Sequence, residues 1–201
     1  MSGQVWPVIP LAVLEAVRDH DRPGEILEAE DLSASLPRRL GLSGVIHTQI
    51  RRYEAAVAAR TNVPIADVSS LMQLVLRRPD GESIMREAGR RVMRQRFGDR
   101  APFTARLLRR SSRLVFGPIR RAARRLLRGM VGNGKPEIIG KPLVIRIAPA
   151  FTAQIGIQAC SLYTGAIEEL VRIFAGRPHG VEHHRCAARG DGECLWRVEV
   201  G

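Results

Sequence analysis

All three cysteines of this 201-residue chain fall in its last 42 residues, and they constrain the fold more than any other feature. Cys160 precedes a helical pattern of apolar residues over positions 162–174, while Cys186 and Cys194 flank a turn centred on Gly190. With that centre the two cysteines stand opposite each other in an antiparallel pair, where Cβ atoms are ~5 Å apart. The sequence therefore predicts a C-terminal hairpin whose thiols converge with a third thiol from the preceding helix.

Three possible metal ligands, Glu182, His183 and His184, lie just before Cys186. Thiolates together with imidazole are the ligands that Zn²⁺ prefers, and a site closed by four protein ligands is usually structural. On a regular strand Glu182 and His184 share the face of Cys186, whereas a bulge after His183 would turn His183 to that face instead. The residues predict a structural zinc site with three cysteines and leave the fourth ligand open.

Two other interpretations of the cysteines compete with zinc. Free cysteines are commonly inert, buried side chains that pack like small apolar residues. Alternatively, Cys186 and Cys194 could form a disulfide across the hairpin, which would leave Cys160 unpaired. The spacing of the cysteines favours the zinc site over both because it matches the family resemblance described next.

The order of these residues resembles the vinyl-4-reductase domain: Cys160, a helical run, Cys186, a Gly-Asp turn, and Cys194 shortly before an aromatic residue. This family includes the bacteriochlorophyll-synthesis 4-vinyl reductase proteins and the sensor domains of phenol-responsive transcription activators. In the sensor domains, three cysteines and a glutamate three residues before the middle cysteine bind one zinc ion. The resemblance covers about residues 141–201 and implies that the three cysteines bind zinc here. His183 occupies the position of the glutamate, and it is the expected fourth ligand.

The resemblance also implies a function in small-molecule binding. The ligand is aromatic in the sensor relatives and is expected to be a tetrapyrrole intermediate in the pigment relatives. Phe151, Tyr163 and Ile167 flank the zinc-linked helix, and we expect them to line an apolar site of the usual kind. Two alternatives stand beside this function: an accessory enzyme or chaperone of bacteriochlorophyll synthesis, and a dimeric interaction subunit, because vesicle-tethering subunits share a related fold. A homodimer is expected.

No catalytic constellation is visible in the sequence. There is no glycine-rich cofactor loop after a strand, no serine in a nucleophile turn and no convincing acid–base pair. A zinc ion with four protein ligands offers no open position to a water molecule. These features favour a binding protein over an enzyme.

The net charge of +12 comes largely from arginines, and many of them lie in a predicted basic amphipathic helix over residues 104–130, with a kink at Gly117-Pro118. A solvated surface helix explains them most simply. Contact with an anionic membrane or an acidic protein comes second, and nucleic acid is disfavoured because no recognition motif accompanies the helix. The nine arginines are Arg106, Arg109, Arg110, Arg113, Arg120, Arg121, Arg124, Arg125 and Arg128.

The chain divides by pattern into a helical part, residues 1–130, and a zinc-binding part, residues 131–201, which together are expected to form one integrated domain. Helices are predicted over 45–60, 64–76 and 82–97, a glycine-rich loop over 129–142, and strands over 143–147, 153–157, 180–187 and 195–200. Helices first and then an antiparallel sheet with one crossing helix define an α+β fold whose C-terminal hairpin is held by zinc.

The cellular compartment is predicted from what the sequence lacks. Residues 1–14 have no basic start of a signal peptide and are interrupted by Pro7 and Pro10. No run of eighteen apolar residues is present. We expect a cytoplasmic protein with reduced thiols and a possible peripheral membrane contact through the basic helix.

Overall fold

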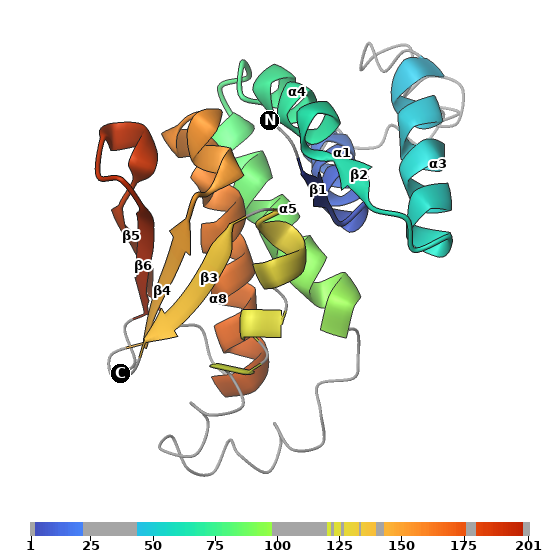
Figure 1. Cartoon of the computed structure of the whole chain (residues 1–201). Helices are drawn as coiled ribbons and strands as arrows, with labels where there is room; N and C mark the ends of the chain where they lie inside the picture. The colour runs from blue at the N-terminus through green and yellow to red at the C-terminus, as the bar shows by residue number, and fades with distance from the viewer. Residues whose placement is uncertain are drawn as a thin grey trace, which may run out of the picture.

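The computed structural model arranges the chain in layers, with a four-stranded sheet on one side and helices on the other (Figure 1). Helix α8 covers the sheet, α5 packs against α8, and α1 lies between α5 and the outer helices α3 and α4 (Figure 1). The structure describes residues 3–21, 44–97, 120–121, 123–125, 127–132, 134–139, 143–175 and 180–198. The α+β class is confirmed, as is the order of helices followed by an antiparallel sheet.

The N-terminal helices form because their apolar residues recur at helical spacing and bury a common face. Helix α1 is buried along most of its length, since it has neighbours on several sides. A short two-stranded ladder, β1 with β2, ties the N-terminus to the start of α4. The elements are β1 (Gln4–Val5), α1 (Val8–His20), α3 (Gly44–Ala58), β2 (Val63–Pro64), α4 (Ile65–Val75) and α5 (Gly81–Phe97).

The two central helices, α5 and α8 (Ser161–Ala175), approach each other through a pair of glycines. A Cβ atom added at Gly89 would collide with the carbonyl of Leu162, and one added at Gly165 would collide with the carbonyl of Arg86. Backbone therefore lies directly on backbone at this crossing. The contact joins the N-terminal helical half to the C-terminal α+β half in one continuous core. The division into parts at residue 130 stays a prediction.

The four-stranded sheet is antiparallel throughout, in the order β3-β4-β6-β5. Strand β4 alternates buried and half-buried residues, and its buried face lies in the core with α8. Strand β6 lies between β4 and β5, and its first residue, Cys194, stands opposite Ile147 at one end of the β4–β6 ladder. The strands are β3 (Lys135–Ile139), β4 (Leu143–Ala148), β5 (Val181–Arg185) and β6 (Cys194–Val198).

Two predictions about the segments around β4 are wrong. Residues 153–157 form no strand, because Phe151–Gln154 and Ile157–Cys160 are two 3-10 turns. In the first turn the Thr152 carbonyl accepts hydrogen bonds from the amides of Ile155 and Gly156. Five residues of alternating pattern do not distinguish a strand from such turns. The predicted glycine-rich loop contains strand β3, whose Lys, Pro and Glu have low strand propensity but are tolerated at the edge of a sheet.

The predicted basic helix is described only in part. Residues 104–119, including the predicted kink at Gly117-Pro118, lie outside the described residues. Residues 120–130 are helical where they are described, and we call them the arginine helix. Ala123, Leu127 and Met130 bury its apolar face in the core. Within the described ranges, no helix has the length and apolar character needed to cross a bilayer.

Candidate metal centre

Four side chains converge where the hairpin meets the start of α8: Cys160, His183, Cys186 and Cys194. One ligand atom of each lies within 4.8 Å of the ligand atoms of all the others. The Sγ atom of Cys186 is 3.9 Å from that of Cys160 and 4.0 Å from that of Cys194. Two sulfurs bound tetrahedrally to one zinc ion, each at ~2.3 Å, are ~3.8 Å apart, so the spacing fits a shared ion. A disulfide needs ~2.05 Å, and all three cysteines are free.

Local backbone geometry places the two hairpin cysteines. Cys186 follows β5 and Cys194 begins β6, and Gly190 (φ 93°) and Gly192 (φ 73°) occur in the turn between them. Both glycines have positive φ values, which residues with a Cβ atom rarely adopt. The carboxylate of Asp191 accepts a hydrogen bond of 2.7 Å from the Cys186 amide. The predicted hairpin is therefore present, and its turn is closed by a side chain as well as by the backbone.

A bulge in β5 selects the histidine that faces the sulfurs. The register of β5 against β6 shifts between His183 and Arg185, which turns His183 toward the cysteines. Its ring stacks on Trp196 at 4.5 Å with an interplanar angle of 6°. Glu182 and His184 instead lie outside the cluster, with the His184 Nδ1 atom 3.9 Å from the Glu182 Oε1 atom. Of the three candidates, His183 is the one that the structure brings to the sulfurs.

One atom of the cluster lacks a protein partner. The His183 Nε2 atom is buried and makes no hydrogen bond to the residues that the structure describes. A buried polar atom without a partner costs ~1–3 kcal/mol. A metal ion among the four ligand atoms would satisfy it, because neutral imidazole nitrogen is a common metal ligand.

The electrostatics of the three thiols also favour a cation. A hydrogen bond from Cys160 lowers the pKa of Cys194 well below its usual range, against the opposing effect of burial, and the Ala187 amide adds to the lowering. The same hydrogen bond and burial raise the pKa of Cys160, and burial raises the pKa of Cys186. Thiolates this close repel one another, so only one is favoured without a cation, whereas a bound metal ion permits all three.

The three predicted ligand-lining residues lie in the hydrophobic core. Phe151, Tyr163 and Ile167 are all buried, and the rings of Phe151 and Tyr163 meet edge to face at 6.2 Å. The Tyr163 hydroxyl donates a hydrogen bond to the Met130 carbonyl at 3.1 Å. Tyr163 also meets Trp196 edge to face at 5.6 Å, which links these residues to His183. Their role in ligand binding stays a prediction.

Sequence reasoning missed two residues that support the cluster. The Thr152 hydroxyl lies 3.2 Å from the Cys160 sulfur. Trp196 donates a hydrogen bond of 3.0 Å to the Thr164 hydroxyl, and its ring stacks on that of His183. The aromatic residue after Cys194 was a visible signal, since an aromatic side chain on β6 faces its neighbour on β5. No spacing rule could have found Thr152, which lies in an irregular 3-10 turn.

Fold and site together define an α+β protein with a three-cysteine, one-histidine cluster that could hold a metal ion. A comparison with protein-family models gives no match, and a comparison with curated proteins gives none either. Among solved structures the chain resembles an H-NOX protein from S. oneidensis, solved in its Fe(II)NO ligation state. The two are 14% identical, with a TM-score of 0.39 over 94% of this chain and 89% of that one. A likeness this loose supports no functional conclusion, so function is argued from the residues.

Proposed function

We propose that this chain is a small-molecule-binding domain of the vinyl-4-reductase type and that its cluster holds a structural zinc ion. The observation that carries the zinc is the convergence of four ligand atoms within 4.8 Å. Three thiolates with one imidazole are a common structural zinc set, and four protein ligands leave no position for a reacting water molecule. No catalytic step is proposed.

In this proposal the zinc ion connects segments that are distant in sequence. Cys160 lies directly before α8, Cys186 ends the β5 side of the hairpin, and Cys194 begins β6, an inner strand of the sheet. A bound ion would fix the hairpin against the start of α8. Because such a site forms only in the folded chain, the free energy of binding would contribute directly to folding.

Zinc loss is expected to have a large effect on stability. We expect about one zinc ion per chain in protein purified without added metal, and a loss of zinc in Cys194→Ser. Structural zinc sites contribute several kcal/mol, so chelation is expected to lower the melting temperature by on the order of 10 °C. Elemental analysis and thermal unfolding with and without a chelator measure both quantities.

The two adjacent histidines supply a matched pair of variants. His183→Ala removes the ring that faces the sulfurs, whereas His184→Ala removes a ring outside the cluster. We expect weaker zinc binding in His183→Ala and wild-type binding in His184→Ala. Full zinc content in Cys194→Ser, or equal affinities in the two histidine variants, would contradict the proposed centre.

The proposed ligand is a small apolar molecule, either aromatic or tetrapyrrole-like, bound between the sheet and α8. Its support is the group of buried aromatic side chains beside the metal cluster: Phe151, Tyr163 and Trp196. Trp196 reports on binding once the other tryptophan, Trp6, is replaced by Phe. We expect aromatic compounds or porphyrins to change Trp196 fluorescence, and a Phe151→Leu variant to weaken that change. A colourless protein with unchanged fluorescence would contradict this proposal.

The remaining functions suggested by the sequence stay predictions. They are an accessory enzyme or chaperone of bacteriochlorophyll synthesis and a dimeric interaction subunit. The homodimer, the cytoplasmic location and the membrane or acidic-protein contact also stay predictions.

A further inference from the structure

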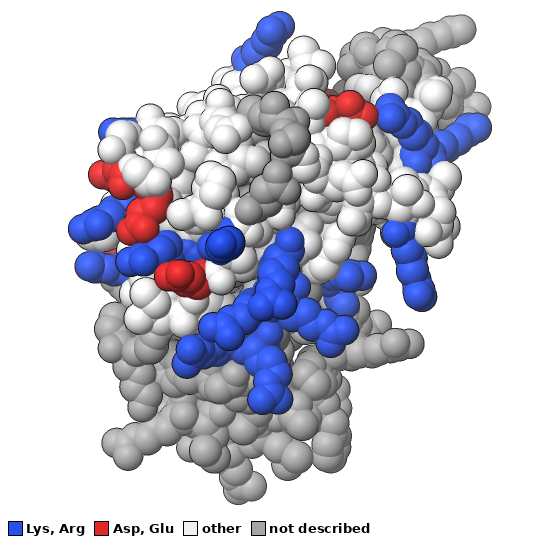
Figure 2. Space-filling model, viewed as in Figure 1, with Lys and Arg blue, Asp and Glu red and all other residues white. Residues whose placement is uncertain are grey.

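The arginine helix carries a compact cluster of positive charge that takes no part in the metal cluster or in the proposed apolar site. One face of the helix is fixed in the core by Ala123, Leu127 and Met130, each at most 1% exposed. The opposite face is exposed and carries arginines in two neighbouring rows. Figure 2 shows the positively charged patch, with Asp and Glu only at its border. We call these residues the arginine cluster: Arg120, Arg121, Arg124, Arg125 and Arg128.

The arginine cluster has no counter-charge in the part of the chain that the structure describes. None of its five guanidinium groups makes an ion pair or a side-chain hydrogen bond with a described residue. Residues four apart on a helix are neighbours, so Arg124 faces like charge on both sides, from Arg120 and Arg128. Like charges that lie together without an acidic partner among the described residues are available to an anion from solution.

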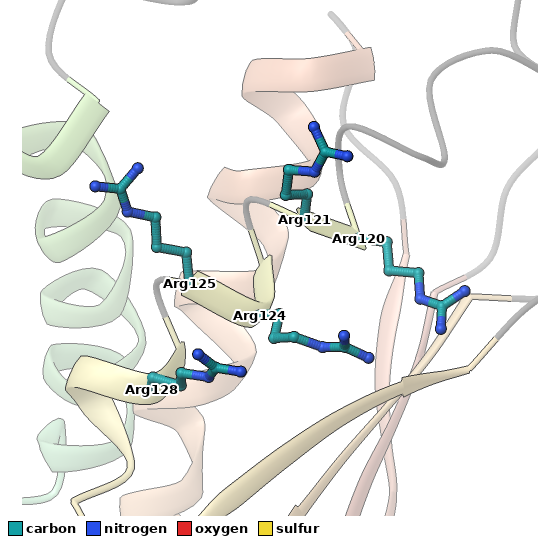
Figure 3. A pocket seen from close by; sticks show the side chains of 5 residues that line it. All are labelled: Arg120, Arg121, Arg124, Arg125 and Arg128. Atoms are coloured by element: carbon teal, nitrogen blue, oxygen red, sulfur yellow. The ribbon is translucent and has the colours of Figure 1, made fainter.

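The side chains border a hollow that is open to solvent. The five arginines line a hollow of about 530 Å³, within the size range of small-molecule sites. Arg120, Arg124 and Arg128 extend side by side from the helix, whereas Arg121 and Arg125 point in another direction (Figure 3). At 1.5 Å per residue the row spans ~12 Å along the helix axis. Guanidinium groups match phosphate oxygens with two parallel hydrogen bonds, and the row of three can serve more than one phosphate at once.

Other anionic partners fit these residues less well. A basic amphipathic helix binds a bilayer by inserting its apolar face, but the apolar face described here is buried in the core. Single-stranded nucleic acid needs aromatic side chains on which bases stack, and the described lining of the hollow consists of arginines alone. Closely spaced negative charges on one small molecule match the hollow best.

We propose that the arginine cluster binds a soluble small molecule with two or more linked phosphate groups. This site is separate from the metal cluster and from the proposed apolar site, so it adds a second, anionic ligand to the protein. Its binding needs neither zinc chemistry nor the residues Phe151, Tyr163 and Ile167.

The test is isothermal titration of the full-length, metal-replete protein with inorganic tripolyphosphate, with inorganic monophosphate at equal ionic strength for comparison. We expect tripolyphosphate to bind at least tenfold more tightly than monophosphate, because several guanidinium groups engage it together. The double variant Arg124→Ala/Arg128→Ala is expected to lose at least tenfold in tripolyphosphate affinity. Because both side chains are exposed, we expect this variant to fold, and circular dichroism checks that it does.

The matched control is Arg51→Ala/Arg77→Ala, which removes the same charge from exposed sites on α3 and just after α4. We expect this control to change the affinity less than threefold. Equal affinity for both phosphates, or an equal loss in the control, would overturn the proposal. Binding to vesicles with 30% anionic phospholipid, or to an RNA oligonucleotide, without binding of tripolyphosphate would overturn it in favour of those partners.

Discussion

Two helices of this protein, α5 and the arginine helix, carry arginines at similar spacing but use them differently. Both bury an apolar face in the core and present arginines on the other side. Four of the five arginines on α5 have a carboxylate partner and the fifth, Arg96, lies over the Trp6 ring, whereas the arginine cluster has no carboxylate partner among the described residues. The α5 ion pairs are Arg86 and Arg90 with Glu168, Arg91 with Asp19, and Arg94 with Glu87.

The difference shows that arginine content alone does not reveal what an arginine does. Three of the α5 pairs join residues 72 to 82 positions apart, so they fix α5 against α1 and α8. Arginines paired in this way contribute to folding. Arginines without partners contribute repulsion, and they gain a role only when an anion arrives.

The largest effect is expected where α5 and α8 touch. Gly89→Ala places a Cβ atom against the carbonyl of Leu162, so the helices must separate, which also draws Arg86 and Arg90 away from Glu168. We expect a loss of about 3 kcal/mol in the free energy of unfolding, measured by urea denaturation. Ser83→Ala, on the exposed side of α5, is the control and should change it by less than about 0.5 kcal/mol. Equal stabilities of Gly89→Ala and Ser83→Ala would mean that the ion pairs with Glu168 do not depend on the close contact of α5 with α8.

A smaller effect is expected from the shared carboxylate itself. Glu168→Gln leaves Arg86 and Arg90 without a charged partner, and we expect a loss of about 1–2 kcal/mol, limited because both arginines are partly exposed to solvent. Glu182→Gln, on a carboxylate whose side chain is 63% exposed, should cost less than about 0.5 kcal/mol. A double-mutant cycle with Arg90→Ala isolates the coupling energy between Arg90 and Glu168. A coupling energy near zero would mean that this α5 arginine contributes no more to folding than an arginine without a partner.

The same carboxylate predicts a pH dependence. Burial raises the pKa of Glu168, but hydrogen bonds from Arg86 and Arg90 outweigh it, so the net pKa is lowered. A folded pKa below the unfolded value of about 4.3 means that ionised Glu168 stabilises the protein above that pH, and that this stability is lost as the pH falls through the folded pKa. We expect the stability difference between wild type and Glu168→Gln to be largest near neutral pH and to shrink below about pH 4. A stability difference between the two proteins that grows toward acid pH would contradict a lowered pKa of Glu168.

The smallest effect should have the opposite sign. Arg124→Glu replaces two like-charge neighbours by two ion pairs, with Arg120 and Arg128, and we expect a gain of about 0.5 kcal/mol at low salt. Arg94→Glu on α5 breaks the pair with Glu87 and should lose about 0.5–1 kcal/mol. Chemical denaturation at two salt concentrations measures both changes, and high salt should reduce them. If Arg124→Glu also destabilised the protein, the contrast between the two helices would be lost.

The sequence by itself determined most of the helices, the C-terminal hairpin and the three sulfur positions. Apolar residues at helical spacing and positive-φ glycines act over a few residues, so their effects are visible in a single sequence. The vinyl-4-reductase resemblance and the zinc ion that it implies stay predictions, although the four side chains named for it lie together.

Only the tertiary structure decided which residue joins the three cysteines and which arginines are paired. A bulge opposite Trp196 turned His183 rather than Glu182 or His184 toward the sulfurs, and a glycine crossing brought Arg86 to Glu168. The strand order and the 3-10 turns at residues 151–160 were decided in the same way. Each depends on contacts between residues distant in sequence, and local spacing carries no information about such contacts.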